Sequence, residues 1–129
     1  MSKAEEIMDF LKQNSIQILS TCVNDRPISR PIGSATLIND RIYYCMNTNK
    51  AMFKQLQNNP KVCICVCAND LSWIRIFSKI VFDEDKNIKQ EFINLGKTRF
   101  KNSDDENFGV FYLDELEAEI HQGLMIKKI

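Results

Sequence analysis

Hydrophobic and polar residues follow two different periods along this chain, and each change of period marks a new element. From Ser2 to Asn14, apolar residues recur at helical spacing behind a Ser2–Glu5 capping-box pair, which predicts an N-terminal helix. Two further helices are expected, one from Lys50 to a stop signal at residues 58–60 and one that ends at Gly96. Segments rich in β-branched or alternating apolar residues predict strands at residues 16–23, 26–38, 41–47, 61–68, 73–83, 108–113 and 116–120.

The connections between the strands are mostly short polar turns, which favours antiparallel neighbours. Asn39-Asp40, for example, is a typical hairpin turn. Pro27 and Pro31 confine their strand to a sheet edge, a bulge or a bend, because proline donates no hydrogen bond to a strand ladder. The sequence therefore predicts one β-rich α+β domain over residues 1–129, with six or seven antiparallel strands in a closed or partly closed barrel flanked by short helices.

The overall charge excludes some classes of partner. Lys and Arg together number 17, and so do Asp and Glu, so the formal net charge is zero. This balance argues against a nucleic-acid surface or a basic membrane patch. The longest apolar run, at residues 62–68, is far shorter than the roughly 20 residues of a membrane helix. The N-terminal segment is charged and amphipathic rather than a signal peptide, so we expect a cytoplasmic protein with no membrane contact.

The cysteines and the histidine offer little catalytic chemistry. Three of the five cysteines, Cys63, Cys65 and Cys67, occupy every second position of one predicted strand. Neighbours on one strand face lie about 6.7 Å apart, too far for a good disulfide, and the spacing lacks the gap of zinc knuckles. We interpret them as small buried hydrophobic residues in a reducing cytosol, in preference to a metal site, and the sequence leaves open whether they face the core or a subunit seam. His121 is the only histidine, and no Gly-x-Ser-x-Gly motif accompanies it.

A candidate phosphate site follows the strand at residues 41–47. There the polar turn Thr48-Asn49-Lys50 opens a helix, whose N-terminus presents free N–H groups and a positive dipole end. Arg30 lies within an apolar strand across the hairpin, so its guanidinium can reach the same phosphate. Each of these residues alone has a simpler explanation. Thr48 could be no more than a helix cap, and each cation could be an ordinary surface charge. Trp73 is either an aromatic residue of the core or its rim, or a wall against a flat ring system.

Four stretches of the chain together resemble a known family. They are Arg30-Pro31-Ile32-Gly33, Thr48-Asn49-Lys50, the helix end at residues 56–60 with Val62, and the strand from Trp73 to Ile80. In their order and spacing they resemble the pyridoxamine-5′-phosphate-oxidase-like, FMN-binding split-barrel family. The likeness is greatest to its small branch of general-stress-protein and nitroimidazole-reductase relatives. Ser78 stands where these relatives usually have glycine, and the residues that hold pyridoxal phosphate in the true oxidase are not evident.

The resemblance implies a homodimer with two FMN molecules at the subunit interface. It implies three kinds of contact with FMN: side chains that hold the phosphate, backbone that flanks the flavin ring and ribityl chain, and an aromatic residue from the same or the partner subunit. The residues implied for the phosphate are Thr48, Asn49 and Lys50 with Arg30. The backbone of Pro31, Ile32 and Gly33 would flank the flavin ring and ribityl chain, and Trp73 would be the aromatic residue.

The function expected from these features is an FMN-dependent oxidoreductase that passes electrons from a reduced nicotinamide, NAD(P)H, to a small acceptor. The flavin would supply the redox chemistry, which agrees with the lack of a catalytic triad or metal cluster in the sequence. One alternative is a non-enzymatic flavin- or haem-binding sensor, carrier or store, and another is an obligate dimer with an empty pocket. The polar stretch at residues 97–107 is expected to be a loop, either disordered or able to gate the pocket.

Overall fold

The computed structural model describes residues 1–129 and contains eight strands and three helices. The β-rich α+β class predicted from the sequence is confirmed, and each of the three helices lies where the apolar spacing placed it. In chain order the elements are α1 (Lys3–Gln13), β1 (Gln17–Val23), β2 (Arg26–Ile32), β3 (Thr36–Ile38), β4 (Arg41–Asn47), α2 (Ala51–Asn58), β5 (Lys61–Cys67), β6 (Trp73–Asp83), α3 (Lys86–Asn94), β7 (Phe108–Gln122) and β8 (Met125–Lys128).

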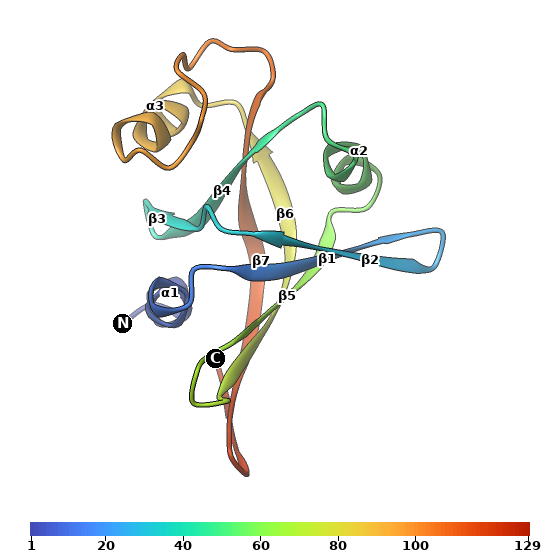
Figure 1. The fold of residues 1–129 in the computed structure, drawn as a ribbon, viewed down its shortest axis with the longest axis vertical. Coiled ribbons are helices and arrows are strands. Elements are labelled where there is room, and N and C mark those ends of the chain that lie inside the picture. Colours follow the sequence, from blue (N-terminus) through green and yellow to red (C-terminus); the bar gives the residue numbers. More distant parts are fainter.

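All strand pairs are antiparallel and belong to one sheet, in the order β2-β1-β5-β6-β7-β4-β3, with β8 added to β7. The two ends of this order, β2 and β3, are joined by only three residues, Gly33 to Ala35. Such a short connection forces the sheet to curl until its edges approach, although they do not pair (Figure 1). The result is a partly closed, split barrel. Pro27 and Pro31 both lie on β2, an edge strand, where a residue without an N–H leaves no neighbouring strand unpaired on the open side.

The eight strands differ from the seven predicted ranges in three places: the range 26–38 is divided, the ranges 108–113 and 116–120 form one strand, β7, and β8 is additional. The segment expected as one strand at residues 26–38 is divided by Gly33-Ser34-Ala35 into β2 and β3. At the other end of the chain, β7 runs unbroken for 15 residues and a hairpin through Gly123, at φ +58°, leads back into β8. Every residue of β8 is exposed, so its sequence carries no alternation of buried and exposed positions from which a strand could be predicted.

Two hydrophobic clusters hold the sheet and helices together. The larger one fills the inside of the curled sheet, where α1 contributes Ile7 and Leu11, both almost fully buried. The smaller one lies under α3 and joins Ile88 and Phe92 to aromatic and aliphatic residues of β4 and β7. None of the helices combines the length and apolar character that crossing a membrane would demand.

Ser78, where the family resemblance implied a glycine, lies at a β-bulge between β6 and β7. The register between β6 and β7 shifts between Phe77 and Lys79, so Ser78 has no direct partner on β7. Its buried hydroxyl instead donates a hydrogen bond to the carbonyl oxygen of Asp114 at 2.6 Å. The serine therefore satisfies its own polar group while the bulge bends the two strands.

Candidate functional site

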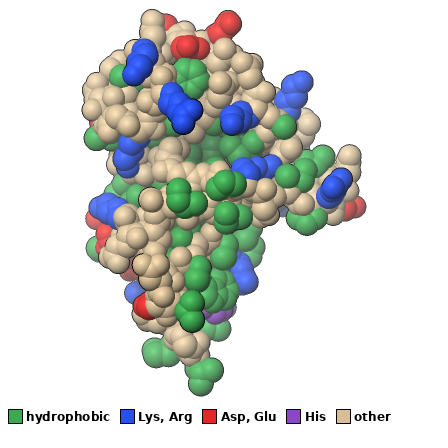
Figure 2. Space-filling model, in the orientation of Figure 1, with side chains coloured by type: hydrophobic (Ala, Val, Ile, Leu, Met, Phe, Trp, Pro, Cys, Tyr) green, Lys and Arg blue, Asp and Glu red, His purple; other side chains and the backbone are tan.

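A large cleft opens at the split in the sheet. One lobe has a volume of about 1040 Å³ and lies between β2, the end of β4 and the first turn of α2. A second lobe of about 720 Å³ adjoins it under residues 96–100. Figure 2 shows the hollow in the upper half of the molecule, with hydrophobic side chains inside it and basic side chains around it. The two lobes share a common wall formed by Cys45, Met46, Asn47, Lys50, Lys97 and Arg99.

All charged side chains that line the cleft are positive. Four cationic residues line it, Arg30, Lys50, Lys97 and Arg99, and neither lobe is lined by an aspartate or a glutamate. The five ion pairs of the molecule involve other cations, so none of these four has a carboxylate partner. A concave surface with four uncompensated positive charges attracts anions and suits a phosphate-bearing ligand.

Arg30 reaches the cleft from β2 and is held in place by neighbouring polar groups. Its Nη1 donates to the Thr21 hydroxyl at 2.9 Å and to the Leu19 carbonyl at 3.3 Å, while Nη2 donates to Gln55 Oε1 at 2.5 Å. These bonds use three of its five N–H donors and leave two for a ligand. Partial burial lowers the pKa of Arg30, although an arginine remains protonated at neutral pH.

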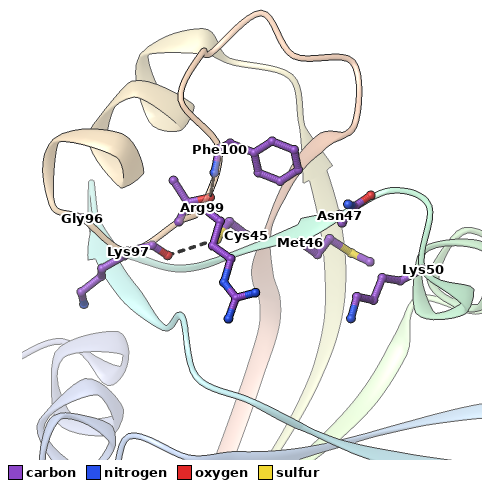
Figure 3. A pocket seen from close by; sticks show the side chains of 9 residues that line it. Cys45, Met46, Asn47, Lys50, Gly96, Lys97, Arg99 and Phe100 are labelled. Atoms are coloured by element: carbon purple, nitrogen blue, oxygen red, sulfur yellow. Dashed lines mark hydrogen bonds between the residues drawn. The ribbon is translucent and has the colours of Figure 1, made fainter.

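Lys50 stands at the N-terminus of α2, on the wall common to both lobes. It is the N-cap residue and makes no side-chain cap bond, so its ammonium is free to extend into the cleft. Figure 3 shows its side chain pointing into the space between β4 and the loop after α3. Ala51 and Met52, the first residues of the helix, also line the larger lobe and bring the positive end of the helix dipole with them.

The structure brings five of the eight sequence-predicted residues to one cleft: Arg30, Pro31, Ile32, Gly33 and Lys50. Thr48 and Asn49 do not line it. The Thr48 amide instead donates to the Asn107 carbonyl at 2.9 Å, and its methyl group packs close to Gly109, where an added Cβ would lie 3.0 Å from Thr48 Cγ2. The Asn49 amide closes the turn by donating to Asn47 Oδ1 at 2.9 Å. Both residues shape the turn that presents Lys50.

Trp73 lies at the far end of β6 and does not line the cleft of its own chain. Its ring stacks on His121, with centroids 3.8 Å apart and planes 5° apart. Arg75 lies over the Trp73 ring and pairs with Glu119 at 2.5 Å. His121 Nε2 is 3.2 Å from the same carboxylate, and the pKa of Glu119 is lowered by His121 and by Arg75. An approach of Trp73 to the cofactor would therefore have to come from a partner subunit.

The sequence predicted that the loop after α3 is either disordered or able to gate the pocket, but it did not single out Lys97 or Arg99 as residues of the cleft. Gly96, at φ +67°, ends the helix with a Schellman motif, in which the Lys97 amide donates to the Phe92 carbonyl at 3.0 Å. The loop then turns toward the cleft, and the Lys97 ammonium donates to the Ala35 carbonyl at 3.3 Å. Figure 3 shows Arg99 pointing into the same space as Lys50. The only signal in the sequence was a pair of basic residues directly after a helix-ending glycine.

The cysteines have a different environment from the one predicted. On β5 the buried positions are Val62, Ile64 and Val66, so Cys63, Cys65 and Cys67 lie on the opposite, outer face. The interpretation as buried residues is wrong because valine and isoleucine occupy the inward positions of the same alternation. All five cysteines are unpaired, and no cluster of three metal-ligating side chains exists. In the cleft, burial raises the pKa of the Cys45 thiol, which disfavours the reactive thiolate.

The curled sheet and the cleft that four cations line define a split-barrel protein. The family model described as pyridoxamine 5′-phosphate oxidase matches residues 4–124 of the chain. The chain belongs to this family, as the motif order predicted. A comparison with curated proteins found no match.

Three solved structures are similar over almost the whole chain. A NimC/NimA family protein from Clostridium acetobutylicum is 26% identical, with a TM-score of 0.92 over 98% of this chain and 90% of that one. A heme binding protein from Mycobacterium smegmatis is 13% identical, with a TM-score of 0.76 over 100% of this chain and 58% of that one. A pyridoxamine 5′-phosphate oxidase-related, FMN binding protein from Nostoc punctiforme is 15% identical, with a TM-score of 0.70 over 99% of this chain and 89% of that one.

Proposed function

We propose that this protein binds FMN in the cleft and acts as an oxidoreductase, passing electrons from NAD(P)H to a small acceptor. The observation that carries the proposal is the cleft itself, which four cations line without any carboxylate to neutralise them. The family and the FMN binding relative from Nostoc punctiforme support flavin as the ligand.

The residues of the cleft fit the chemistry of FMN. Its phosphate carries a charge of about −1.5 to −2, which matches a site between Arg30 and Lys50 at the positive end of α2. Its flat ring system needs an apolar slot, and Pro31, Ile32 and Met46 provide one in the larger lobe. At about 1040 Å³, this lobe lies at the upper end of the usual range for cofactor sites.

Each group of residues has a distinct role in this proposal. Arg30, fixed by Gln55 and Thr21, orients the phosphate, and Lys50 adds a mobile point charge. Pro31, Ile32 and Gly33 line the cleft at the unpaired edge of β2 and directly after it, where their backbone can flank a ring. When bound, the flavin supplies a two-electron redox centre, so the chain itself needs no catalytic triad.

We further propose that the working form is a homodimer with the cofactor at the subunit interface. The outer surface exposes large apolar side chains with no helix over them, among them Ile16, Ile18 and Phe77. The tip of the β7–β8 hairpin exposes Leu124, Met125 and Ile126 as well. Such surfaces mark interaction sites, and Trp73, distant from its own cleft, would be brought to the cofactor of the partner.

The dimer is tested by sedimentation of the purified protein at micromolar concentration. A particle of twice the 15.0 kDa chain mass is expected. In that dimer, replacing Trp73 with phenylalanine should shift the visible spectrum of bound FMN, because the aromatic neighbour of the ring changes. A monomer that binds FMN with full affinity would contradict the interface proposal and leave the cleft proposal intact.

A non-enzymatic flavin- or haem-binding store is the second candidate, because it would use the same cleft and the same fold includes a heme binding protein. A haem ligand is harder to find here. The only histidine, His121, lies outside both lobes, and the sulfur-bearing residues that line the cleft are Cys45, Met46 and Met52. The five unpaired thiols also support the proposal that the protein works in the reducing cytoplasm.

Visible spectroscopy of freshly purified protein tests the function. FMN, identified by mass spectrometry of the released ligand, is expected in the as-isolated protein or after its addition. Under anaerobic conditions NADH or NADPH should then bleach the visible absorbance of the flavin, because each donates two electrons to it. Retained flavin that neither nucleotide nor other reductants bleach would favour storage, and a protein that takes up no flavin would refute both flavin proposals.

A further inference from the structure

The cleft carries more positive charge than one cofactor phosphate can neutralise. Arg30, Lys50, Lys97 and Arg99 contribute four charges, and no acidic residue lines either lobe. A bound phosphate monoester removes about two of them. Roughly two positive charges would remain in a partly enclosed space, where like charges repel each other. This imbalance calls for a second anionic group.

The four cations also fall into two sets with different environments. Arg30 and Lys50 come from β2 and the start of α2, and both line the larger lobe. Lys97 and Arg99 come from the loop after α3 and border both lobes. Arg30 already donates three hydrogen bonds to the protein, whereas Arg99 donates none and keeps all five N–H donors for a ligand.

The loop that carries Lys97 and Arg99 is fixed to the body of the protein. The Schellman motif at Gly96 and the Lys97 contact with Ala35 hold its beginning. Its next residue, Phe100, stacks on Phe108 with ring centroids 4.7 Å apart and planes 7° apart. Phe100 lines the smaller lobe together with the two cations, and in Figure 3 its ring points away from the Lys97 and Arg99 side chains, so this lobe offers charge and aromatic surface at different places. A phosphate joined to a flat ring matches that combination.

We propose that Lys97 and Arg99 form a second anion subsite, separate from the FMN phosphate site, that holds the phosphate groups of a nucleotide electron donor. This inference rests on the proposed function and names the part of the substrate that the site recognises. Arg99 binds the anion through its planar fork, Lys97 adds charge, and Phe100 offers a surface to the nucleotide ring system. The subsite accordingly affects binding of the donor and leaves the affinity for FMN almost unchanged.

Steady-state kinetics of the FMN-loaded protein separates the two subsites. Arg99→Ala is expected to raise the KM for NADH or NADPH roughly 10- to 100-fold, the effect of losing charged hydrogen bonds, with FMN affinity changed less than about threefold. Arg99→Lys should recover part of the loss. Lys101→Ala is the matched control, because Lys101 is an exposed cation of the same loop that lines neither lobe. An unchanged donor KM in Arg99→Ala would overturn the proposal, and so would a loss of FMN affinity as large as that expected for Lys50→Ala.

Calorimetry on FMN-free protein gives a second readout that does not depend on turnover. Inorganic pyrophosphate is expected to bind with two equivalents per chain, of which Arg99→Ala removes one and Lys50→Ala removes the other. Wild-type protein that binds no FMN would refute the proposed function. If Arg99→Ala nevertheless binds one pyrophosphate fewer than wild type, the subsite stands. Equal pyrophosphate binding by wild type and Arg99→Ala would refute the subsite. So would binding of citrate without pyrophosphate, since the ligand would then be a carboxylate.

Discussion

Replacing Lys50 with alanine is expected to weaken FMN binding by roughly 10- to 100-fold, the largest effect on cofactor affinity that we predict. The ammonium lies at the N-terminus of α2, lines both lobes and has no partner within the protein. Its removal takes away a charge-assisted contact with the phosphate and leaves the helix intact, because Lys50 makes no side-chain cap bond. The measurement is the dissociation constant of FMN from fluorescence titration.

Lys54→Ala is the matched control for this experiment. Lys54 lies one turn further along α2, is exposed and lines neither lobe, so its replacement removes the same charge and the same length of side chain. Its effect on FMN affinity should stay within about twofold, since surface charges at this distance are screened by salt. Equal losses in the two variants would indicate a general electrostatic attraction and would contradict a phosphate site at Lys50.

Substitutions of Arg30 test the second cation that we assign to the FMN phosphate. Arg30→Lys keeps the charge but loses the planar fork, and a lysine cannot reproduce the bonds to Gln55, Thr21 and Leu19 together. We expect it to weaken FMN binding almost as much as Arg30→Ala does. The exposed Arg26 on the same strand serves as its control. Combined with Lys50→Ala, the losses should be less than additive, because both side chains act on one phosphate.

Replacing Phe92 with alanine is expected to reduce the free energy of unfolding by about 3–5 kcal/mol, the largest effect on stability. Phe92 is fully buried and lies at the centre of the small hydrophobic cluster beneath α3, against Tyr43, Phe108 and Val110. Alanine would leave a cavity that the flanking strands β4 and β7 cannot close. Urea unfolding, followed by circular dichroism, measures the change.

The same helix supplies a control for the stability effect. Leu95 lies at the C-terminal end of α3 and its side chain is 52% exposed, so Leu95→Ala should cost less than about 1 kcal/mol. Phe92→Leu, which keeps most of the buried volume, should fall between the two. A Phe92→Ala variant as stable as Leu95→Ala would show that the cluster under α3 contributes little to holding the sheet and the loop in place.

The sequence by itself determined the local elements of this protein. Apolar spacing located α1, α2 and α3, alternation located most strands, and the two prolines limited their strand to an edge, a bulge or a bend, of which the structure shows the edge. It also singled out Arg30 and Lys50, which the structure places on one cleft. These features depend on short-range rules, such as the side-chain period of each element, the missing N–H of proline and the turn preferences of asparagine and aspartate.

The tertiary structure alone decided which side chains meet at the site. Lys97 and Arg99 lie about 50 residues after Lys50 in the sequence, and only the docking of α3 on β4 and β7 brings their loop to the cleft. The same holds for Cys63, Cys65 and Cys67, since an alternating strand of valine, isoleucine and cysteine has two apolar faces. Which of them turns inward depends on how the whole sheet curls, and that is a property of long-range packing, absent from any local pattern.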